Sequence, residues 1–387
     1  MPNPVIVRKV ENKADFKAFF EFPWELYKDD PNWVPPLLSM RRELLDKDEN
    51  PSWEYLVGDY YVAWRGEKPV GTIAAFANKR HNAEHEENIS WFGFFEVYED
   101  QEAATELLKT AVEWGKSHGY DAVRGPQSFT NMEECGLLID NFSRPVFLMP
   151  YNPPYYQTLI ENAGLGLTKV MDTHSIYQNW EQFENSNSRQ RFAKLIKRIN
   201  RNNSITVRQI DKKNMREDFE LFKAIYNSAW ERNWGFTPFT TKELDALVEA
   251  LGKFFDPRLA CFAYVDDEPV GFAIMTPDFN QVLHKAYARP GVPEPITLIK
   301  ALWHWKIRPK MDWLRTPLLG VKAEHHGKGV DLVMFDFLMK QVGKTNFKNL
   351  DSGWILETNK PTLQAGFSMG MNIYKTYRFY ETPINSK

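Results

Sequence analysis

Cysteine is scarce in this chain of 387 residues, where only Cys135 and Cys261 occur, far apart and without histidine or cysteine neighbours at metal-ligand spacing. This scarcity excludes a disulfide framework and indicates that the chain holds no metal site. Long apolar runs are lacking as well, so we expect neither a membrane span nor a secretory signal. Together these absences predict a cytoplasmic protein.

The chain also lacks an excess of either charge, since 48 Lys and Arg stand against 51 Asp and Glu and leave a net charge of −3. Nucleic-acid binding usually needs a strongly basic surface, so no nucleic-acid partner is expected. Aromatic residues are plentiful instead, with 13 Trp, 16 Tyr and 27 Phe, which favours large cores or aromatic-lined clefts. The length exceeds what one hydrophobic core usually serves, so two domains are expected.

Part of the chain repeats at a nearly constant spacing. Tyr61–Gly71 aligns without a gap on Cys261–Gly271, a shift of 200 (271 − 71), and both copies share an alanine and a Pro-Val-Gly ending. Further on, the segment that starts at Asn152 matches the one that starts at Asn359, a shift of 207 (359 − 152). Each half also carries a strand, a long amphipathic helix and another strand, an order that predicts a crossover unit in a mixed sheet.

The repeat predicts an N-terminal lobe over 1–180 and a C-terminal lobe over 204–387, joined by a linker over 181–203. A basic amphipathic helix is expected in the linker, over 189–201. Its cations form either a patch that binds phosphate or an acidic membrane surface, or simply the solvated face of an interdomain helix. The second lobe has an insertion over 282–313 with a helix around 299–307. That helix either covers a cleft or binds a partner.

A strand, a glycine-containing loop and a helix follow one another in LLGVKAEHHGKGVD, from Leu318 to Asp331. Glycines let backbone amides point at an anion, and the start of a helix adds its positive end, so a pyrophosphate is a suitable ligand. The stretch resembles the coenzyme loop of the GNAT superfamily of N-acetyltransferases, Arg/Gln-x-x-Gly-x-Gly/Ala, with Gly329 at the central glycine. His326 and Asp331 depart from that pattern at its first and last positions.

Both halves resemble GNAT lobes in the order of their segments, and the chain as a whole is similar to bacterial proteins with paired GNAT-like lobes at 22–36, 230–238 and 374–380. The resemblance implies an α/β fold (α+β mixed sheet) of two tandem GNAT-like acyl-CoA N-acyltransferase lobes. It also implies acetyl-CoA or another acyl-CoA as co-substrate, bound by Val321, Lys322, His326, Gly327, Lys328, Gly329, Val330 and Asn359.

The first lobe is expected to be degenerate at the coenzyme position. Where the glycine loop should stand, it has Glu99–Ala103, a segment with three carboxylates and no glycine. Carboxylates repel a pyrophosphate, so at most one lobe, the second, is predicted to bind the donor.

The second lobe lacks the tyrosine that serves many GNAT enzymes as an acid, because the position counted from Asn359 falls near Gly366 or Phe367. If the chain is an enzyme, the catalytic candidates are Glu357, Asp278 and His284. Each has an ordinary alternative role: a loop cap for Glu357, a turn residue for Asp278, and a surface or core histidine for His284.

Substrate-binding residues are expected where GNAT proteins build their acceptor wall, at Trp230, Asn233 and Trp234, together with Asn280. The same tryptophans could instead close the core of the second lobe. The resulting hypothesis is an acyl-CoA-dependent N-acyltransferase acting on a small-molecule amine or peptide in a cleft between the lobes. The alternatives are a non-catalytic metabolite- or peptide-binding protein and a Fem-type aminoacyltransferase. The sequence makes no prediction of oligomeric state.

Overall fold

The computed structural model describes residues 3–130, 133–202, 204–230, 234–245 and 256–384. Its contacts divide the chain into two compact units. The first unit contains 1–173, 280–309 and 375–387, and the second contains 174–279 and 310–374. Residues 181–203, predicted to be a linker, therefore cluster with the second unit, whereas part of the predicted insertion and the C-terminal end cluster with the first.

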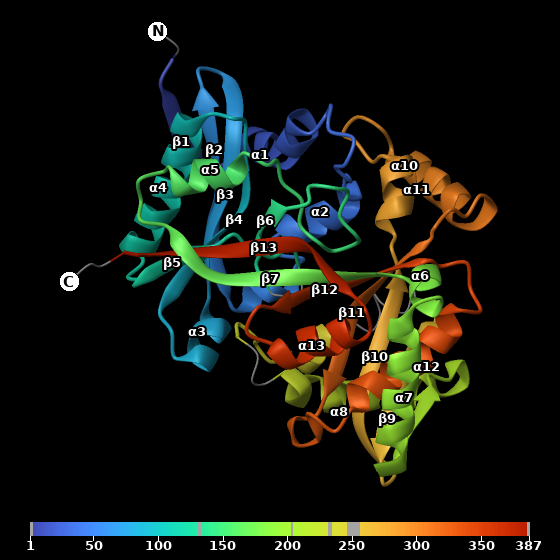
Figure 1. Cartoon of the computed structure of the whole chain (residues 1–387). Helices are drawn as coiled ribbons and strands as arrows, with labels where there is room; N and C mark the ends of the chain where they lie inside the picture. The colour runs from blue at the N-terminus through green and yellow to red at the C-terminus, as the bar shows by residue number, and fades with distance from the viewer. Residues whose placement is uncertain (1–2, 131–132, 203, 231–233, 246–255, 385–387) are drawn as a thin grey trace. The chain divides into compact units, whose positions relative to one another are not determined.

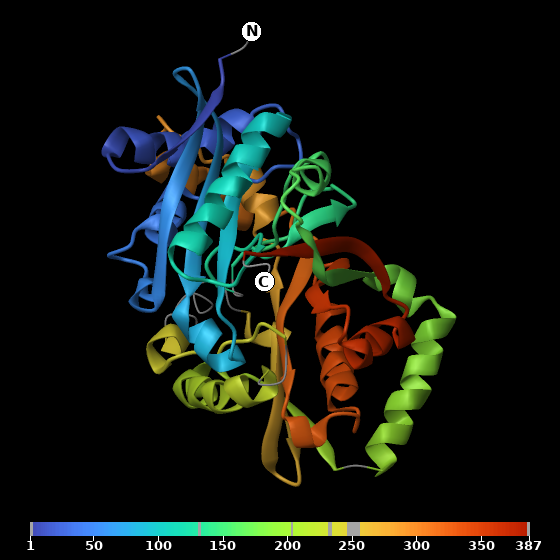
Figure 2. The same ribbon diagram turned by 90° about the vertical axis from the view of Figure 1, so that its left-hand side faces the viewer.

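The first unit is a mixed sheet in the strand order β1-β2-β3-β4-β5-β13, covered by helices (Figure 1). Helix α4 lies against the strands because its apolar residues recur at helical spacing, and Leu107, Leu108 and Ala111 are buried there as the sequence predicts (Figure 2). The elements are β1 Val5–Lys9, α1 Lys13–Leu26, α2 Leu38–Leu45, η1 Pro51–Glu54, β2 Leu56–Arg65, β3 Lys68–Asn78, α3 Lys79–His85, β4 Ile89–Val97, α4 Gln101–Ser117, β5 Ala122–Gly125, β6 Leu137–Asp140, α5 Tyr156–Glu161, α10 Asn280–Ala286, α11 Glu294–Leu302 and η4 Trp303–Ile307.

The second unit has the strand order β12-β11-β10-β9-β8, with β7 next to β12. Its core includes Phe192 and Ile196 of the basic helix α7, so one face of this helix is buried and the other carries the cations. The elements are α6 Trp180–Glu184, α7 Asn187–Asn202, β8 Ile205–Gln209, η2 Lys212–Asn214, α8 Met215–Trp230, η3 Pro257–Leu259, β9 Ala260–Val265, β10 Glu268–Pro277, β11 Trp313–Val321, η5 Ala323–His325, α12 Val330–Val342, β12 Asn349–Leu356 and α13 Lys360–Ser368; β7 Thr168–Asn179 and β13 Asn372–Pro383 have one end in each unit.

Strand pairing reproduces the repeat found in the sequence. Gly71 of β3 pairs with Ala63 of β2, and Gly271 of β10 pairs with Ala263 of β9, so both predicted hairpins are confirmed at the same spacing. In each unit the next strand is antiparallel and contains a β-bulge, and it then pairs in parallel with β5 or β12 over three residues. The two units thus have the same strand plan, as expected for tandem GNAT-like lobes.

Among the described residues, none of the helices is both long enough and apolar enough to cross a membrane. Both cysteines are buried thiols. Within the same residues, no group of three or more histidine, cysteine, aspartate or glutamate side chains could hold a metal ion.

Candidate active site

The predicted coenzyme loop of the second unit is a strand–loop–helix, as the sequence indicated. β11 ends at Val321, and α12 begins at Val330, after Gly327 and Gly329 with φ of +75° and +82°. This left-handed backbone favours glycine at both positions. Lys322 forms an ion pair with Glu268 at 2.7 Å, and Nε2 of His326 donates to the carbonyl of Val321 at 2.8 Å. Two of the predicted ligands therefore already have partners on the protein.

Asp331 occupies the start of α12, where a phosphate would have to bind. Its carboxylate accepts the backbone N–H groups of Asp331 itself and of Leu332, and burial raises its pKa. The positive end of a helix favours any carboxylate placed there. A pyrophosphate that used these amides would have to displace Asp331. Asn359, another predicted ligand, caps α13 by accepting the N–H of Thr362.

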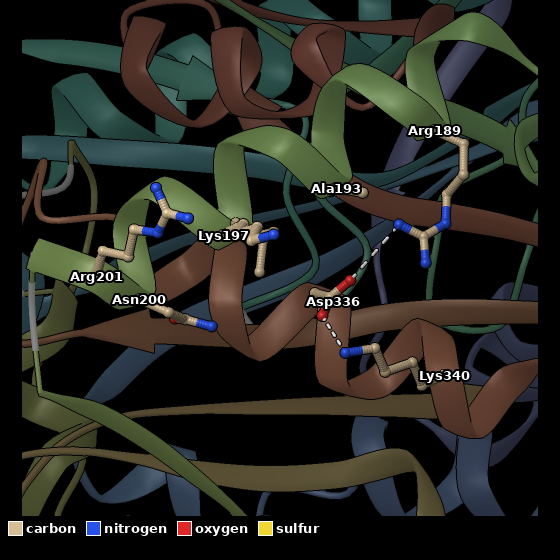
Figure 3. Close-up of a pocket in the computed structure, with 8 residues that line it drawn as sticks. Arg189, Ala193, Lys197, Asn200, Arg201, Asp336 and Lys340 are labelled. Atoms are coloured by element: carbon tan, nitrogen blue, oxygen red, sulfur yellow. Dashed lines mark ion pairs between the residues drawn. The ribbon is translucent and has the colours of Figure 1, made fainter.

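Helix α7 packs over this loop and forms a groove with α12. A side chain at Gly329 would lie 2.7 Å from Ile199 of α7, so the two segments are in close contact. The groove, of about 450 Å³, has basic side chains on both helices (Figure 3). Asp336 of α12 forms ion pairs with Lys340 at 2.6 Å and with Arg189 at 3.8 Å. The groove is lined by Arg189, Ala193, Ile196, Lys197, Asn200, Arg201, Asp336 and Lys340.

The three predicted catalytic residues lie in separate local settings. Asp278 is buried at the end of β10, where its backbone N–H donates to the carbonyl of Trp313 at 3.0 Å. Glu357 is half-buried just after β12. His284 belongs to the first unit, on α10, where its Nε2 donates to the carbonyl of Pro31 at 3.0 Å.

The predicted substrate-binding residues also divide between the units. Trp230 ends α8, and its ring lies 2.9 Å from where a methyl group on Gly320 would stand. Trp234 is half-buried, while Asn233 lies outside the described residues. Asn280 is buried in the first unit, where its amide donates to the carbonyl of Pro145 at 3.1 Å.

A carboxyl that the sequence analysis missed lies in the first unit, near the end of β4. The phenol of Tyr27 donates to Oε2 of Glu96 at 2.7 Å, and the phenol of Tyr156 donates to the same oxygen at 2.9 Å. The N–H of Val97 in turn donates to the Tyr156 oxygen at 2.7 Å. Both tyrosines are buried and Glu96 is half-buried. Side chains from α5, from the end of α1 and from β4 thus converge on one carboxylate oxygen.

The surroundings set the pKa of Glu96 close to neutral pH. Burial raises the pKa to about 7, against the lowering effect of the two phenol hydrogen bonds and of the Arg41 charge. Burial also raises the pKa of Tyr27 and of Tyr156 well above the usual tyrosine value, so both phenols stay protonated and act as donors. A carboxyl that titrates near pH 7 can take up and release a proton under physiological conditions.

The charges of Arg41 of α2 and of Glu134 also act on the Glu96 carboxyl. The Arg41 charge lowers the pKa of both Glu96 and Glu134, and its Nε donates to the carbonyl of Phe20 at 3.1 Å. Glu134 is an exposed residue, and desolvation of its carboxyl by the surrounding protein raises its pKa to about 7. The half-buried Glu96, whose pKa is raised and which is held by two phenols, is the carboxyl with the features that are typical of functional sites.

The backbone next to Glu96 is also unusual. Phe94 has φ of +47°, at the β-bulge where the pairing of β3 and β4 shifts register. Such a conformation is strained for an aromatic residue and tends to occur at functional sites. Phe94 packs against Phe129 with ring centroids 4.8 Å apart. The bulge directs the following residues of β4, including Glu96, away from the regular alternation of the strand.

The sequence contained two signals for this cluster. Glu96 is the only charged residue in the run from Trp91 to Val97, and a lone carboxylate in an apolar strand is unusual. Tyr156 stands four residues after Asn152, on the helix where GNAT enzymes carry their acid. The seven-residue count that leads from Asn359 to Gly366 leads from Asn152 to Leu159, three residues past Tyr156, so this count does not find the tyrosine of the first half.

Comparison with known proteins agrees with the fold. The Acetyltransferase (GNAT) family matches residues 18–127, a range that includes Glu96. A tandem GNAT protein from the clavulanic acid biosynthesis pathway superimposes with a TM-score of 0.50 at 10% identity, covering 99% of both chains. At this identity the likeness concerns the fold alone.

Two relatives match along nearly the whole chain. Protein YghO of Escherichia coli strain K12 is 31% identical over 384 residues, which cover 98% of this chain and 95% of the relative. The bacterial ceramide synthase of Caulobacter vibrioides is 28% identical over 383 residues, covering 97% and 96%. The chain is therefore a member of the GNAT superfamily of acyltransferase-like proteins and belongs to the family that contains protein YghO.

Proposed function

We propose that the protein is an acyl-coenzyme A-dependent N-acyltransferase and that Glu96 of the first unit is its general base. The observation that carries the proposal is the carboxyl of Glu96, which has a pKa of about 7 and is held by the phenols of Tyr27 and Tyr156. A base with a pKa near the working pH combines a useful ionised fraction with a useful proton affinity.

The proposed reaction joins an amine to the acyl group of a thioester. The amine nitrogen attacks the thioester carbonyl, a C–N bond forms, and the C–S bond breaks as the coenzyme thiolate leaves. Glu96 accepts the proton that the amine loses, and the protonated carboxyl then passes a proton to the thiolate. Proton transfer of this kind contributes roughly 10²–10⁴-fold to a rate.

The donor site in the second unit remains a prediction. The left-handed glycines of the loop and the basic groove formed by α7 and α12 favour a phosphate-rich ligand there. Asp331 opposes it, because its carboxylate already takes two amides at the start of α12. The corresponding helix of the first unit, α4, is less favourable still, because Asp100 accepts the N–H of Ala103 and carboxylates surround it.

The acceptor is proposed to be an amine with a long apolar chain. The relative from Caulobacter vibrioides is called a ceramide synthase, and a ceramide is the amide of a long-chain amino alcohol. Because this chain is 28% identical to that relative along nearly its whole length, we favour a long-chain amine over a small polar one as the acceptor.

The test measures thiol release from acetyl-, octanoyl- and palmitoyl-coenzyme A with ethanolamine, a peptide amine and a long-chain amino alcohol as acceptors. Glu96→Gln should lower kcat by at least roughly 100-fold, since it keeps the hydrogen-bond acceptor and removes the base. Glu99→Gln is the matched control, because Glu99 is exposed three residues further along the chain. Wild-type kcat in Glu96→Gln would disprove the assigned base.

A non-catalytic binding protein is the second candidate. It is favoured by Asp331, which occupies the amides of the predicted coenzyme loop. The two candidates differ in a simple outcome: saturable binding of a long-chain amine without thiol release from any of the three donors supports the binding protein, whereas thiol release supports the enzyme.

A further inference from the structure

One short stretch of the first unit exposes most of the large apolar side chains found at the surface. Of the eleven such side chains that are exposed among the described residues, six lie between 296 and 307. Soluble surfaces rarely gather apolar groups so closely unless they bind something. The six residues are Ile296, Leu298, Ile299, Leu302, Trp303 and Ile307, with exposed fractions from 46% to 69%.

These residues share one side of α11 and η4. Thr297 is buried and Ala301 is half-buried, and the spacing of four residues places both on the side that faces the unit. Ile299 and Trp303 have the same spacing on the outward side, and Ile299 is the most exposed of the six at 69%. The helix therefore presents an apolar stripe to solvent.

The segment that carries the stripe is fixed to α1 and α2. Trp24 Nε1 donates to the carbonyl of Ala288 at 2.7 Å, and the backbone N–H of Ser39 donates to Glu294 at 2.8 Å. Trp33 and Tyr287 pack edge to face, with ring centroids 6.4 Å apart. The stripe is thus part of the folded unit and is exposed by the native structure.

Positive charge surrounds the stripe. Residues 280–309 contain five cations against one carboxylate, Glu294, whereas the whole chain has a net charge of −3. Glu294 accepts hydrogen bonds from Ser39, which draws its charge toward α2. The cations are Lys285, Arg289, Lys300, Lys306 and Arg308, and all five are exposed.

We propose that α11 and η4 dock the protein on the surface of an anionic phospholipid bilayer. Isoleucine, leucine and tryptophan would enter the boundary between headgroups and acyl chains, while lysine and arginine reach the phosphates. Charge complementarity favours lipid over a second copy of this chain, because the second copy would bring the same cations to the same face. Attraction of these cations to the anionic lipid surface adds to the apolar contact.

Docking at this place would bring the membrane to the elements that hold the candidate site. α2 carries Arg41, and Tyr27 follows directly after α1. A long-chain amine in the bilayer could then pass from the lipid directly into the first unit. The docking inference itself does not depend on the proposed catalysis, since it rests on exposure and charge alone.

The experiment sediments the full chain with phosphatidylcholine vesicles that contain roughly 30% phosphatidylglycerol, and with pure phosphatidylcholine vesicles. We expect binding to the anionic vesicles that is at least roughly tenfold stronger than to the neutral ones and that weakens at high salt. Ile299→Glu should lose at least roughly tenfold of this binding, because it places a charge in the apolar stripe. Ile373→Glu is the matched control, since Ile373 is 42% exposed in the second unit.

Thermal unfolding of both variants confirms that they fold, as expected for exposed positions. The proposal is overturned if the wild-type chain stays in the supernatant, or if Ile299→Glu binds as the wild type does. It is also overturned if the wild type forms a dimer in solution that Ile299→Glu dissolves while neither binds vesicles, because the stripe is then an interface between copies. None of these outcomes depends on thiol release, so the docking and the proposed reaction can fail separately.

Discussion

Glu96 and Gly320 occupy equivalent positions in the two units. Glu96 of β4 pairs with Thr72, one residue after the Gly71–Val97 pair, and Gly320 of β11 pairs with Phe272, one residue after Gly271–Val321. In the first unit the carboxylate at this position accepts a hydrogen bond from the phenol of Tyr27. In the second unit the position has no side chain, and the ring of Trp230 fills the space above it.

The two units therefore differ in the features that acyl transfer needs. The first unit has the carboxyl of Glu96 and a tyrosine after Asn152, but its helix α4 begins among carboxylates. The second unit has the glycine loop but lacks both the carboxyl and the tyrosine. Proton transfer is therefore proposed for Glu96 of the first unit, and a variant of Asp331 tests the coenzyme loop of the second unit by itself.

The first prediction concerns the pH dependence of the reaction. Because Glu96 must be ionised to accept a proton, kcat/KM should rise with pH and level off with an apparent pKa of about 7. The residual rate of Glu96→Gln should lack this step, while Glu99→Gln should keep it. A step that persists unchanged in Glu96→Gln would assign it to another group, with Glu134 as the next to replace because its carboxyl also has a pKa of about 7.

The second prediction concerns the phenols that hold Glu96. Their hydrogen bonds favour the ionised carboxylate and so lower its pKa. Tyr27→Phe should therefore move the pH profile to higher pH, by roughly half a unit to one unit, at unchanged plateau kcat. Tyr155→Phe is the control, because the Tyr155 phenol donates to the carbonyl of Val97 and not to Glu96. An unshifted profile in Tyr27→Phe would show that this phenol has only a structural role.

The third prediction concerns stability. The pKa of Glu96 is about 7 in the folded protein and is raised from an unfolded value near 4.5, so the folded state binds the proton more tightly. Between these pKa values the free energy of unfolding falls as pH rises. The loss is complete above pH 7 and amounts to at most about 3 kcal/mol, reduced by solvent screening because Glu96 is only half-buried. Glu96→Gln removes this titration, so it should raise the unfolding temperature at pH 8 and change it little at pH 5.

Thermal unfolding followed by circular dichroism at the two pH values measures this effect, with Glu99→Gln as control. If the two units unfold in separate transitions, Glu96→Gln should shift the transition of the first unit. Tyr156→Phe identifies that transition, because Tyr156 belongs to the same unit. An unfolding temperature of Glu96→Gln that is lowered equally at both pH values would contradict a carboxyl that titrates near pH 7 in the folded protein.

The fourth prediction tests the coenzyme loop through Asp331. If the amides at the start of α12 bind a pyrophosphate, Asp331→Asn should tighten binding of acetyl-coenzyme A by roughly tenfold, because it removes a negative charge from that place. Asp266→Asn is the control, since Asp266 is exposed in the turn between β9 and β10. Calorimetric titration measures both. Equal affinities in wild type and Asp331→Asn would leave the loop as a structural turn.

The sequence predicted the repeated architecture well because its signals are local. The Pro-Val-Gly ending marks both hairpins, and the apolar spacing around Leu107 and Leu338 marks both long helices. The cluster around Glu96 is different, because Tyr27, Arg41 and Tyr156 come from three distant segments. Their convergence depends on packing, and no local pattern contains it. The lone carboxylate in an apolar strand and the tyrosine after Asn152 are signals in the sequence, but neither shows that the two side chains meet.

The glycine loop is a different case, because the sequence predicted the strand, loop and helix but did not predict which side chains pack on the loop. The sequence shows Asp331 as a departure from the motif at the start of the helix, and the folded loop places its carboxylate on the amides, whereas the position of Ile199 over Gly329 has no signal in the sequence. Both neighbours follow from side-chain direction and from the packing of α7, which residue spacing alone does not specify.

The last prediction tests that packing. Gly327 and Gly329 both have positive φ, so alanine at either should cost about 1–2 kcal/mol in backbone strain. At Gly327 a methyl group meets open space, but at Gly329 it would lie 2.7 Å from Ile199. Gly329→Ala should therefore cost about 1–3 kcal/mol more than Gly327→Ala. In chemical denaturation, Ile199→Ala should remove much of this difference, and strictly additive effects of Ile199→Ala and Gly329→Ala would show that α7 does not rest on the loop.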